Sequence, residues 1–162
     1  MPARAMARNK RAMALRNRLM HWWFLVRRPV TLGARAIVLD GEGRVLLVKH
    51  SYVAGWHLPG GGVEPGETAL DCVRREIAEE ANVSLGAPLR LHAFYFNPAA
   101  SVRDHVALYV CEGAVQTAPK AADREILAAG FFALEALPED ITQATARRLA
   151  EWRSGSEPDP VW

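Results

Sequence analysis

The chain has 162 residues, of which 50% are hydrophobic and 23% are charged, which suits one soluble domain with a buried core. Its two cysteines, Cys72 and Cys111, match no metal or redox spacing and exclude a disulfide-rich scaffold. Nine of the 20 Lys and Arg lie in residues 1–36, which contain no acidic residue. Residues 37–162 hold the other eleven together with all 18 acidic residues, so their net charge is −7. This asymmetry suggests an anionic partner for the leader and a bound cation for the body.

Residues 1–30 are expected to form a basic, aromatic leader that is helical over residues 1–20. Its apolar run, residues 19–26, is too short to span a bilayer and lacks a small-residue cleavage site. Arginines flank the run, so residues 16–28 fit an anionic membrane surface. Packing of the aromatic side chains on the domain or on a second subunit of a homodimer is the alternative that we favour. No nucleic-acid motif accompanies the basic residues, and no nucleic acid is expected as a partner.

A hairpin is predicted after the leader. Residues 34–39 and 44–49 are rich in aliphatic side chains, and the turn-forming residues 40–43 separate them. A short strand at residues 56–58 precedes three consecutive glycines, residues 60–62. Such a run allows either tight turns or close approach of the backbone to a ligand.

Residues 68–82 are predicted to form a helix. Thr68 is a suitable N-cap, and Asp71 follows it at the spacing of a capping box. Apolar residues spaced i, i+3 and i+7 predict the face that packs on the core: Leu70, Val73 and Ile77.

The second half of the chain is predicted to contain three strands and a final helix. The strands are expected at residues 89–96, 105–111 and 130–134, and the helix at residues 137–153. Two prolines in the last residues predict a loose tail, 155–162, after a domain that spans residues 31–154.

The helix at residues 68–82 carries three carboxylates that should share one face. Glu76, Glu79 and Glu80 are spaced i, i+3 and i+4, and like charges at that spacing repel. Arg75 offsets only part of this repulsion. A solvated acidic face and a site for a hard cation such as Mg²⁺ or Mn²⁺ both fit this pattern.

The surrounding sequence favours the cation site. Residues 61–83 read Gly-x5-Glu-x7-Arg-Glu-Ile-x-Glu-Glu-x-Asn-Val, which resembles the Nudix box at eight of its nine specified positions. The departure is Asn82, where the family has glycine. Asparagine is the residue next best suited to end a helix in the left-handed conformation, so we expect a small stability cost and intact chemistry.

The resemblance implies an α/β fold, an α/β/α sandwich around a central mixed sheet, that hydrolyses a nucleoside diphosphate linked to another group. It implies that Glu76, Glu79 and Glu80 bind Mg²⁺ or Mn²⁺, with the carbonyl of Gly61 or its neighbour completing the shell. Arg75 would orient a carboxylate, Glu67 or Glu79. Either Glu79 or Glu125, in a later loop, would be the general base.

The substrate is less well defined by the sequence. Pro98 lies at an offset similar to that in members that cleave ADP-ribose, but Asn-Pro is also common in turns. The side chains expected to flank the cleft and bind a base or phosphate are Trp56, Arg90, Tyr95 and Arg103. A nucleotide, a nucleotide sugar and ADP-ribose all remain candidate substrates.

Two other hypotheses compete with a cytoplasmic hydrolase. The first is a binding module that keeps the fold and senses a nucleotide without cutting it. Such modules usually lose one or more helix glutamates, whereas all of them are present here. The second is the same enzyme attached peripherally to a membrane through its leader.

Overall fold

The structure is a computed structural model that describes residues 13, 16–18, 20, 22–24 and 26–162. The chain divides into two units, Met1–Val30 and Thr31–Trp162. Most of the helix predicted over residues 1–20 lies outside the described residues. The described residues 22–24 are helical, and the rings of Trp23 and Phe24 meet edge to face. Among the described helices, none combines the length and the apolar character that a bilayer-spanning segment requires.

The second unit consists of eight strands and two helices. In chain order these are β1 (Thr31–Asp40), β2 (Val45–His50), β3 (Trp56–His57), β4 (Gly60–Gly62), α2 (Ala69–Ala81), β5 (Val83–Ser84), β6 (Arg90–Phe96), β7 (Asp104–Gln116), β8 (Ile126–Phe132) and α3 (Gln143–Ser154).

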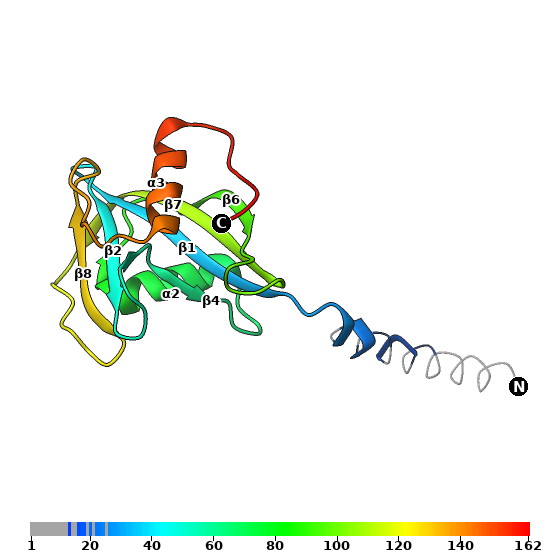
Figure 1. The fold of residues 1–162 in the computed structure, drawn as a ribbon. Coiled ribbons are helices and arrows are strands. Elements are labelled where there is room, and N and C mark those ends of the chain that lie inside the picture. The colour runs from blue at the N-terminus through cyan, green and yellow to red at the C-terminus, as the bar shows by residue number, and fades with distance from the viewer. Residues whose placement is uncertain (1–12, 14–15, 19, 21, 25) are drawn as a thin grey trace, which may run out of the picture. The chain divides into compact units, whose positions relative to one another are not determined.

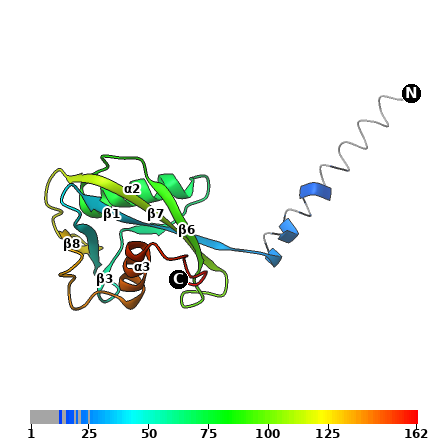
Figure 2. The ribbon, with the colours of Figure 1, turned by 90° about the horizontal axis from the view of Figure 1, so that it is seen from above.

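The strands form a mixed sheet that lies between the two helices. The sheet runs β3-β2-β1-β7-β5, with β8 beside β2, β4 beside β1 and β6 beside β7. Only the long central pair, β1 and β7, is parallel; the other pairs are antiparallel. Helix α2 covers one face and α3 the other, as both views show (Figures 1 and 2). The predicted α/β/α sandwich is therefore confirmed.

Helix α2 is the element whose sequence signals match the structure most closely. Thr68 is the N-cap and accepts a hydrogen bond from the Asp71 N–H at 3.1 Å. Val73 and Ile77 are fully buried against the sheet, as their spacing predicted. Asn82 ends the helix in the left-handed conformation, with φ 52° and ψ 41°. Asparagine thus takes the conformation that glycine adopts more readily.

A hydrophobic core lies between the sheet and α3. Leu149 and Arg148 of α3 are buried there, and the Arg148 guanidinium lies 4.6 Å from the ring centroid of Tyr95. Helix α3 begins at Gln143, not at residue 137 as predicted. The difference arises because residues 140–142 form backbone hydrogen bonds with Trp56 of β3. The Trp56 N–H donates to Asp140 O at 3.0 Å, and the Thr142 N–H donates to Trp56 O at 3.1 Å.

The tail after α3 is not loose, which corrects the prediction. Phe96 donates its N–H to Pro160 O at 2.8 Å, and Trp162 donates to Phe96 O at 2.8 Å, so the tail extends the sheet beside β6. The Trp162 ring also packs edge to face on Tyr95. The sequence gives no local signal for this long-range pairing.

Of the two alternatives for the glycine run, the tight turn is not what the structure shows, since Gly60–Gly62 forms strand β4. A Cβ at Gly60 would collide with Ala34 O of β1, and the φ of Gly60 is 141°, a value that other residues rarely adopt. The strand predicted at residues 105–111 is longer in the structure, Asp104–Gln116. The strand predicted at residues 130–134 begins and ends earlier, at Ile126–Phe132.

The helix end gives a first testable prediction. Asn82→Ala should lower the free energy of unfolding by about 1 kcal/mol, because alanine pays a steric cost in the left-handed region that asparagine reduces. Asn82→Gly is the matched control and should be at least as stable as wild type. Urea denaturation of the three proteins measures both differences, and equal stability of Asn82→Ala and Asn82→Gly would contradict this account.

Candidate functional site

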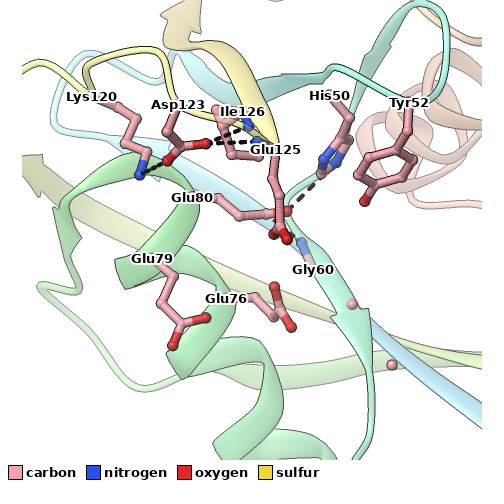
Figure 3. A pocket seen from close by; sticks show the side chains of 12 residues that line it. His50, Tyr52, Gly60, Glu76, Glu79, Glu80, Lys120, Asp123, Glu125 and Ile126 are labelled. Atoms are coloured by element: carbon pink, nitrogen blue, oxygen red, sulfur yellow. Dashed lines mark hydrogen bonds and ion pairs between the residues drawn. The ribbon is translucent and has the colours of Figure 1, made fainter.

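The acidic face of α2 borders a cavity of about 470 Å³ between the helix, β4 and the loop before β8 (Figure 3). The structure brings Glu76, Glu79 and Glu80 together along this cavity. The residues that line it are His50, Tyr52, Gly60, Gly61, Gly62, Glu76, Glu79, Glu80, Lys120, Asp123, Glu125 and Ile126.

The missing side chains of β4 allow α2 to approach the sheet closely. Glu80 Oε2 accepts a hydrogen bond from the Gly60 N–H at 3.0 Å. A Cβ on Gly61 would collide with the Glu76 carboxylate. Gly61 is thus required by the close packing of the Glu76 carboxylate on β4, whereas Gly60 is required by its close contact with the backbone of β1.

Glu80 is the most deeply buried acid of the site, with 6% of its surface exposed. Burial raises the pKa of its carboxyl to about 7. The Gly60 N–H and the charge of Arg35 oppose this shift, while the charges of Glu76 and Glu79 add to it. A carboxylate kept this far from water, with two others near it, is a strong ligand for any cation that enters.

Arg75 relieves part of the repulsion from the side away from the cavity lining. Its guanidinium contacts Glu76 at 2.8 Å, Glu67 at 3.0 Å and Glu79 at 3.3 Å. The hydrogen bonds that Arg75 donates to Glu67 and Glu76 raise the pKa of its guanidinium above the ordinary value. Glu67 is fixed in turn by the Glu64 N–H at 2.8 Å. Arg75 therefore holds the carboxylates in place and is not itself exposed to the cavity.

The loop before β8 brings Glu125 to the same cavity. Asp123 Oδ1 accepts hydrogen bonds from the N–H groups of Glu125 and Ile126 at 2.9 and 2.8 Å. These bonds, with a contribution from Lys120, hold the pKa of Asp123 well below its usual range. The loop is also tied to the end of β2, because Ser51 donates its N–H to Glu125 O at 2.8 Å. Glu125 is thus presented by an ordered turn.

Sequence reasoning did not identify His50, Tyr52 or Lys120 as cavity residues. His50 Nε2 lies 3.5 Å from Glu80 Oε1. Burial lowers the pKa of His50 to about 4, so at neutral pH the imidazole is uncharged and this contact is not an ion pair. Burial, then the charge of Glu80, raises the pKa of Tyr52. All three side chains reach the cavity through tertiary contacts that no local motif reveals.

The donor set of the cavity fits a hard divalent cation. The carboxylates of Glu76, Glu79 and Glu80 line it together with the backbone of Gly61. Within the described part of the chain, no three acidic, His or Cys side chains already converge as a metal-binding cluster. Arg75 and Gly60 hold the carboxylates in their present positions, so binding would require them to turn toward a common centre.

The side chains predicted to bind substrate do not line this cavity. Tyr95 is fully buried and donates its hydroxyl proton to Glu151 at 2.5 Å. Trp56 packs edge to face on Phe132 in the core under α3. Arg90 and Arg103 are exposed elsewhere on the surface. These four side chains therefore lie apart from the acidic cavity, and their role in substrate binding stays a prediction.

Pro98 lies in a turn, where Ala100 and Ser101 both donate their N–H groups to Asn97 O at 3.2 Å. The Asn97 side chain donates to Asp104 at 2.8 Å and fixes the turn to the start of β7. Ordinary turn chemistry accounts for the Asn-Pro pair.

Comparison with known proteins gives related sequences. The chain is 32% identical over 129 residues to the 8-oxo-dGDP phosphatase NUDT18 of Mus musculus, covering 78% of this chain and 39% of the relative. It is 45% identical over 64 residues to a putative 8-oxo-dGTP diphosphatase of Bacillus subtilis, covering 38% of this chain and 43% of the relative. The chain thus spans about two-fifths of the length of these curated relatives.

Solved structures share the fold. A MutT NUDIX hydrolase from Burkholderia pseudomallei superposes with a TM-score of 0.62 at 28% identity, covering 74% of this chain and 95% of the other. An ADP-ribose pyrophosphatase from Streptococcus suis gives a TM-score of 0.55 at 24% identity, covering 79% and 94%, and shows the fold alone. The family model described as the NUDIX domain matches residues 29–152. With the box on α2 and this architecture around it, the chain belongs to the Nudix family.

Proposed function

We propose that this chain is a divalent-metal-dependent hydrolase that cleaves a diphosphate linkage in a nucleotide or nucleotide derivative. The observation that carries the proposal is the cavity into which Glu76, Glu79 and the buried Glu80 face together. A sensing module without catalysis would not need to retain all three. The names of the related phosphatases and diphosphatases support the same reaction class.

The residues have separate tasks in this proposal. Glu76, Glu79 and Glu80 hold Mg²⁺ or Mn²⁺, and the Gly61 carbonyl is the candidate backbone ligand. The bound cation would neutralise phosphate charge and promote ionisation of the attacking water. Arg75 acts as a positioning residue, since its guanidinium is taken up by carboxylates.

Two carboxylates are candidates for the general base that takes the proton from water. The Glu79 carboxylate forms an ion pair with Arg75, at 3.3 Å. Glu125 has no ion-pair partner among the described residues, and its loop presents it to the cavity. Its free charge makes Glu125 the stronger candidate.

A second cavity, of about 380 Å³, offers room for the part of the substrate beyond the diphosphate. It is lined by Arg35, Val53, His57, Asn97, Ala99, Ala100, Thr142, Ala144, Thr145 and Trp162. His57 of this cavity and His50 of the acidic cavity have ring centroids 5.6 Å apart, so the two spaces are neighbours. The polar side chains and the Trp162 ring of this cavity could bind a nucleoside. The exposed Arg90 offers no such enclosed site.

Glu80→Gln tests the proposal. Turnover with Mg²⁺ should fall by at least about 100-fold on the substrate that wild type hydrolyses fastest among nucleoside triphosphates, dinucleotides, ADP-ribose and nucleotide sugars. The exposed Glu139→Gln is the control and should keep wild-type rates. Released phosphate is measured, and circular dichroism checks the fold. Wild-type turnover by Glu80→Gln would refute the metal assignment, and no turnover of any substrate by wild type would refute the reaction.

The raised pKa of Glu80 predicts a pH dependence of stability. Because the folded pKa, about 7, exceeds the ordinary value of 4.5, this carboxyl stabilises the fold fully below pH 4.5, and the contribution is lost as pH rises through 7. In EDTA, the unfolding free energy of wild type relative to Glu80→Gln should fall between pH 5 and pH 8 by on the order of 1–3 kcal/mol. Urea denaturation measures the difference, and a constant difference would contradict the assignment of this pKa.

For the leader, we propose a peripheral association with an anionic membrane surface through residues 16–28. The support is the excess of basic residues and the aromatic side chains of Trp22, Trp23 and Phe24 beside Arg27, whose guanidinium lies 5.7 Å from the Trp23 ring centroid. Full-length protein should float with vesicles containing about 30% phosphatidylserine but not with phosphatidylcholine vesicles. Trp22→Ser with Trp23→Ser should abolish flotation, and equal flotation of wild type and this variant would exclude the proposal.

A further inference from the structure

The acidic cavity contains one cationic side chain among the described residues that line it. Four glutamates and Asp123 surround the space. Lys120, in the loop between β7 and β8, is the exception. Arg75 is occupied by three carboxylates of its own. Any fixed positive charge that this cavity offers an anion therefore comes from Lys120.

Lys120 is held in a defined position. Its side chain is 16% exposed, and Nζ lies 2.7 Å from Asp123 Oδ2. Figure 3 shows the ammonium above the Glu79 end of α2, beside the turn that carries Glu125. A lysine ammonium has three N–H donors, and the ion pair uses one of them. Two donors are left for a ligand in the cavity without any loss of the ion pair.

Bonds other than this ion pair also shape the loop. Asp123 uses its other oxygen, Oδ1, for the two backbone bonds that shape the turn, to Glu125 and Ile126. Asp123 and Ile126 are also joined by a backbone bond of 2.9 Å. These bonds do not involve Lys120. Lys120 is a partly buried lysine at the rim of an acidic cavity, where an anionic ligand can reach its ammonium group.

We propose that Lys120 binds a phosphate group of the diphosphate substrate, next to the metal-binding carboxylates. This inference rests on the proposed function and adds a substrate-binding residue to it. A diphosphate brings several negative charges into a space lined by carboxylates. A bound cation would offset charge on the phosphate oxygens near the carboxylates, and Lys120 offsets charge on an oxygen farther along the chain of phosphates. Asp123 keeps Lys120 aimed, so little side-chain entropy is lost on binding.

The test is binding of α,β-methylene-ADP, which cannot be cleaved at its diphosphate, by full-length protein with Mg²⁺, measured by calorimetry. Lys120→Met keeps the length of the side chain and removes its charge, and should weaken binding by about 10- to 100-fold. Lys120→Arg should stay within about threefold of wild type, because it restores the charge. The slope of log Kd against log salt should also be smaller for Lys120→Met, since one phosphate contact is lost.

Lys49→Met is the matched control. Lys49 also pairs with an aspartate, Asp140, at 2.6 Å, but it lies outside the cavity, and its replacement should leave the analogue's Kd unchanged. Steady-state kinetics on the best substrate should show that Lys120→Met raises KM more than it lowers kcat. A fall in kcat with an unchanged Kd would overturn the inference and make Lys120 a loop-ordering residue.

The two proposals fail in different ways. If wild type binds the analogue with Mg²⁺ and Lys120→Met does not, but no substrate is hydrolysed, the binding role of Lys120 stands and the hydrolase proposal falls. If wild type hydrolyses a substrate and Lys120→Met binds the analogue as tightly as wild type does, the inference about Lys120 is wrong. If wild type does not bind the analogue, the inference is also wrong, because the cavity then takes no diphosphate.

Discussion

The hydrogen bond from the Gly60 N–H to the buried carboxyl of Glu80 is the contact on which the site depends. It joins α2 to β4, and through β4 to β1 at the centre of the sheet. A carboxyl placed there pays a desolvation cost that one backbone donor only partly offsets, as its pKa of about 7 records. The arrangement is therefore poorer for stability than an apolar contact would be, and a cation is what would compensate it.

Arg75 explains how the helix tolerates its acidic face before any cation binds. Glu76 and Glu79 would repel each other across one turn, but the guanidinium lies against both and against Glu67. The same network fixes the orientations of Glu76 and Glu79, whose carboxylates line the cavity. Arg75 thus both balances the charge of these glutamates and positions them.

Local chemistry made part of this structure predictable. Helix α2 was predicted with both of its ends because Thr68 and Asn82 act through backbone contacts within a few residues. The resemblance of residues 61–83 to the Nudix box supplied the family and the layered fold. The start of α3 was not predicted, since residues 140–142 are drawn into pairing with Trp56, far away in the sequence. The docked tail was missed for the same reason.

The candidate substrate residues show where sequence reasoning stops. Tyr95 and Arg90 lie on one strand, yet Tyr95 turns under α3 while Arg90 faces solvent, and a register shift between Leu91 and Ala93 alters the alternation between them. Side-chain direction on a bulged strand cannot be assigned from spacing alone. Lys120 illustrates the converse: nothing near it in sequence marks a binding residue, and only the fold brings it to the helix glutamates. The residues proposed to bind the metal are thus marked by a local motif on α2, whereas the residue proposed to bind the substrate lies in a loop that only tertiary structure brings to the cavity.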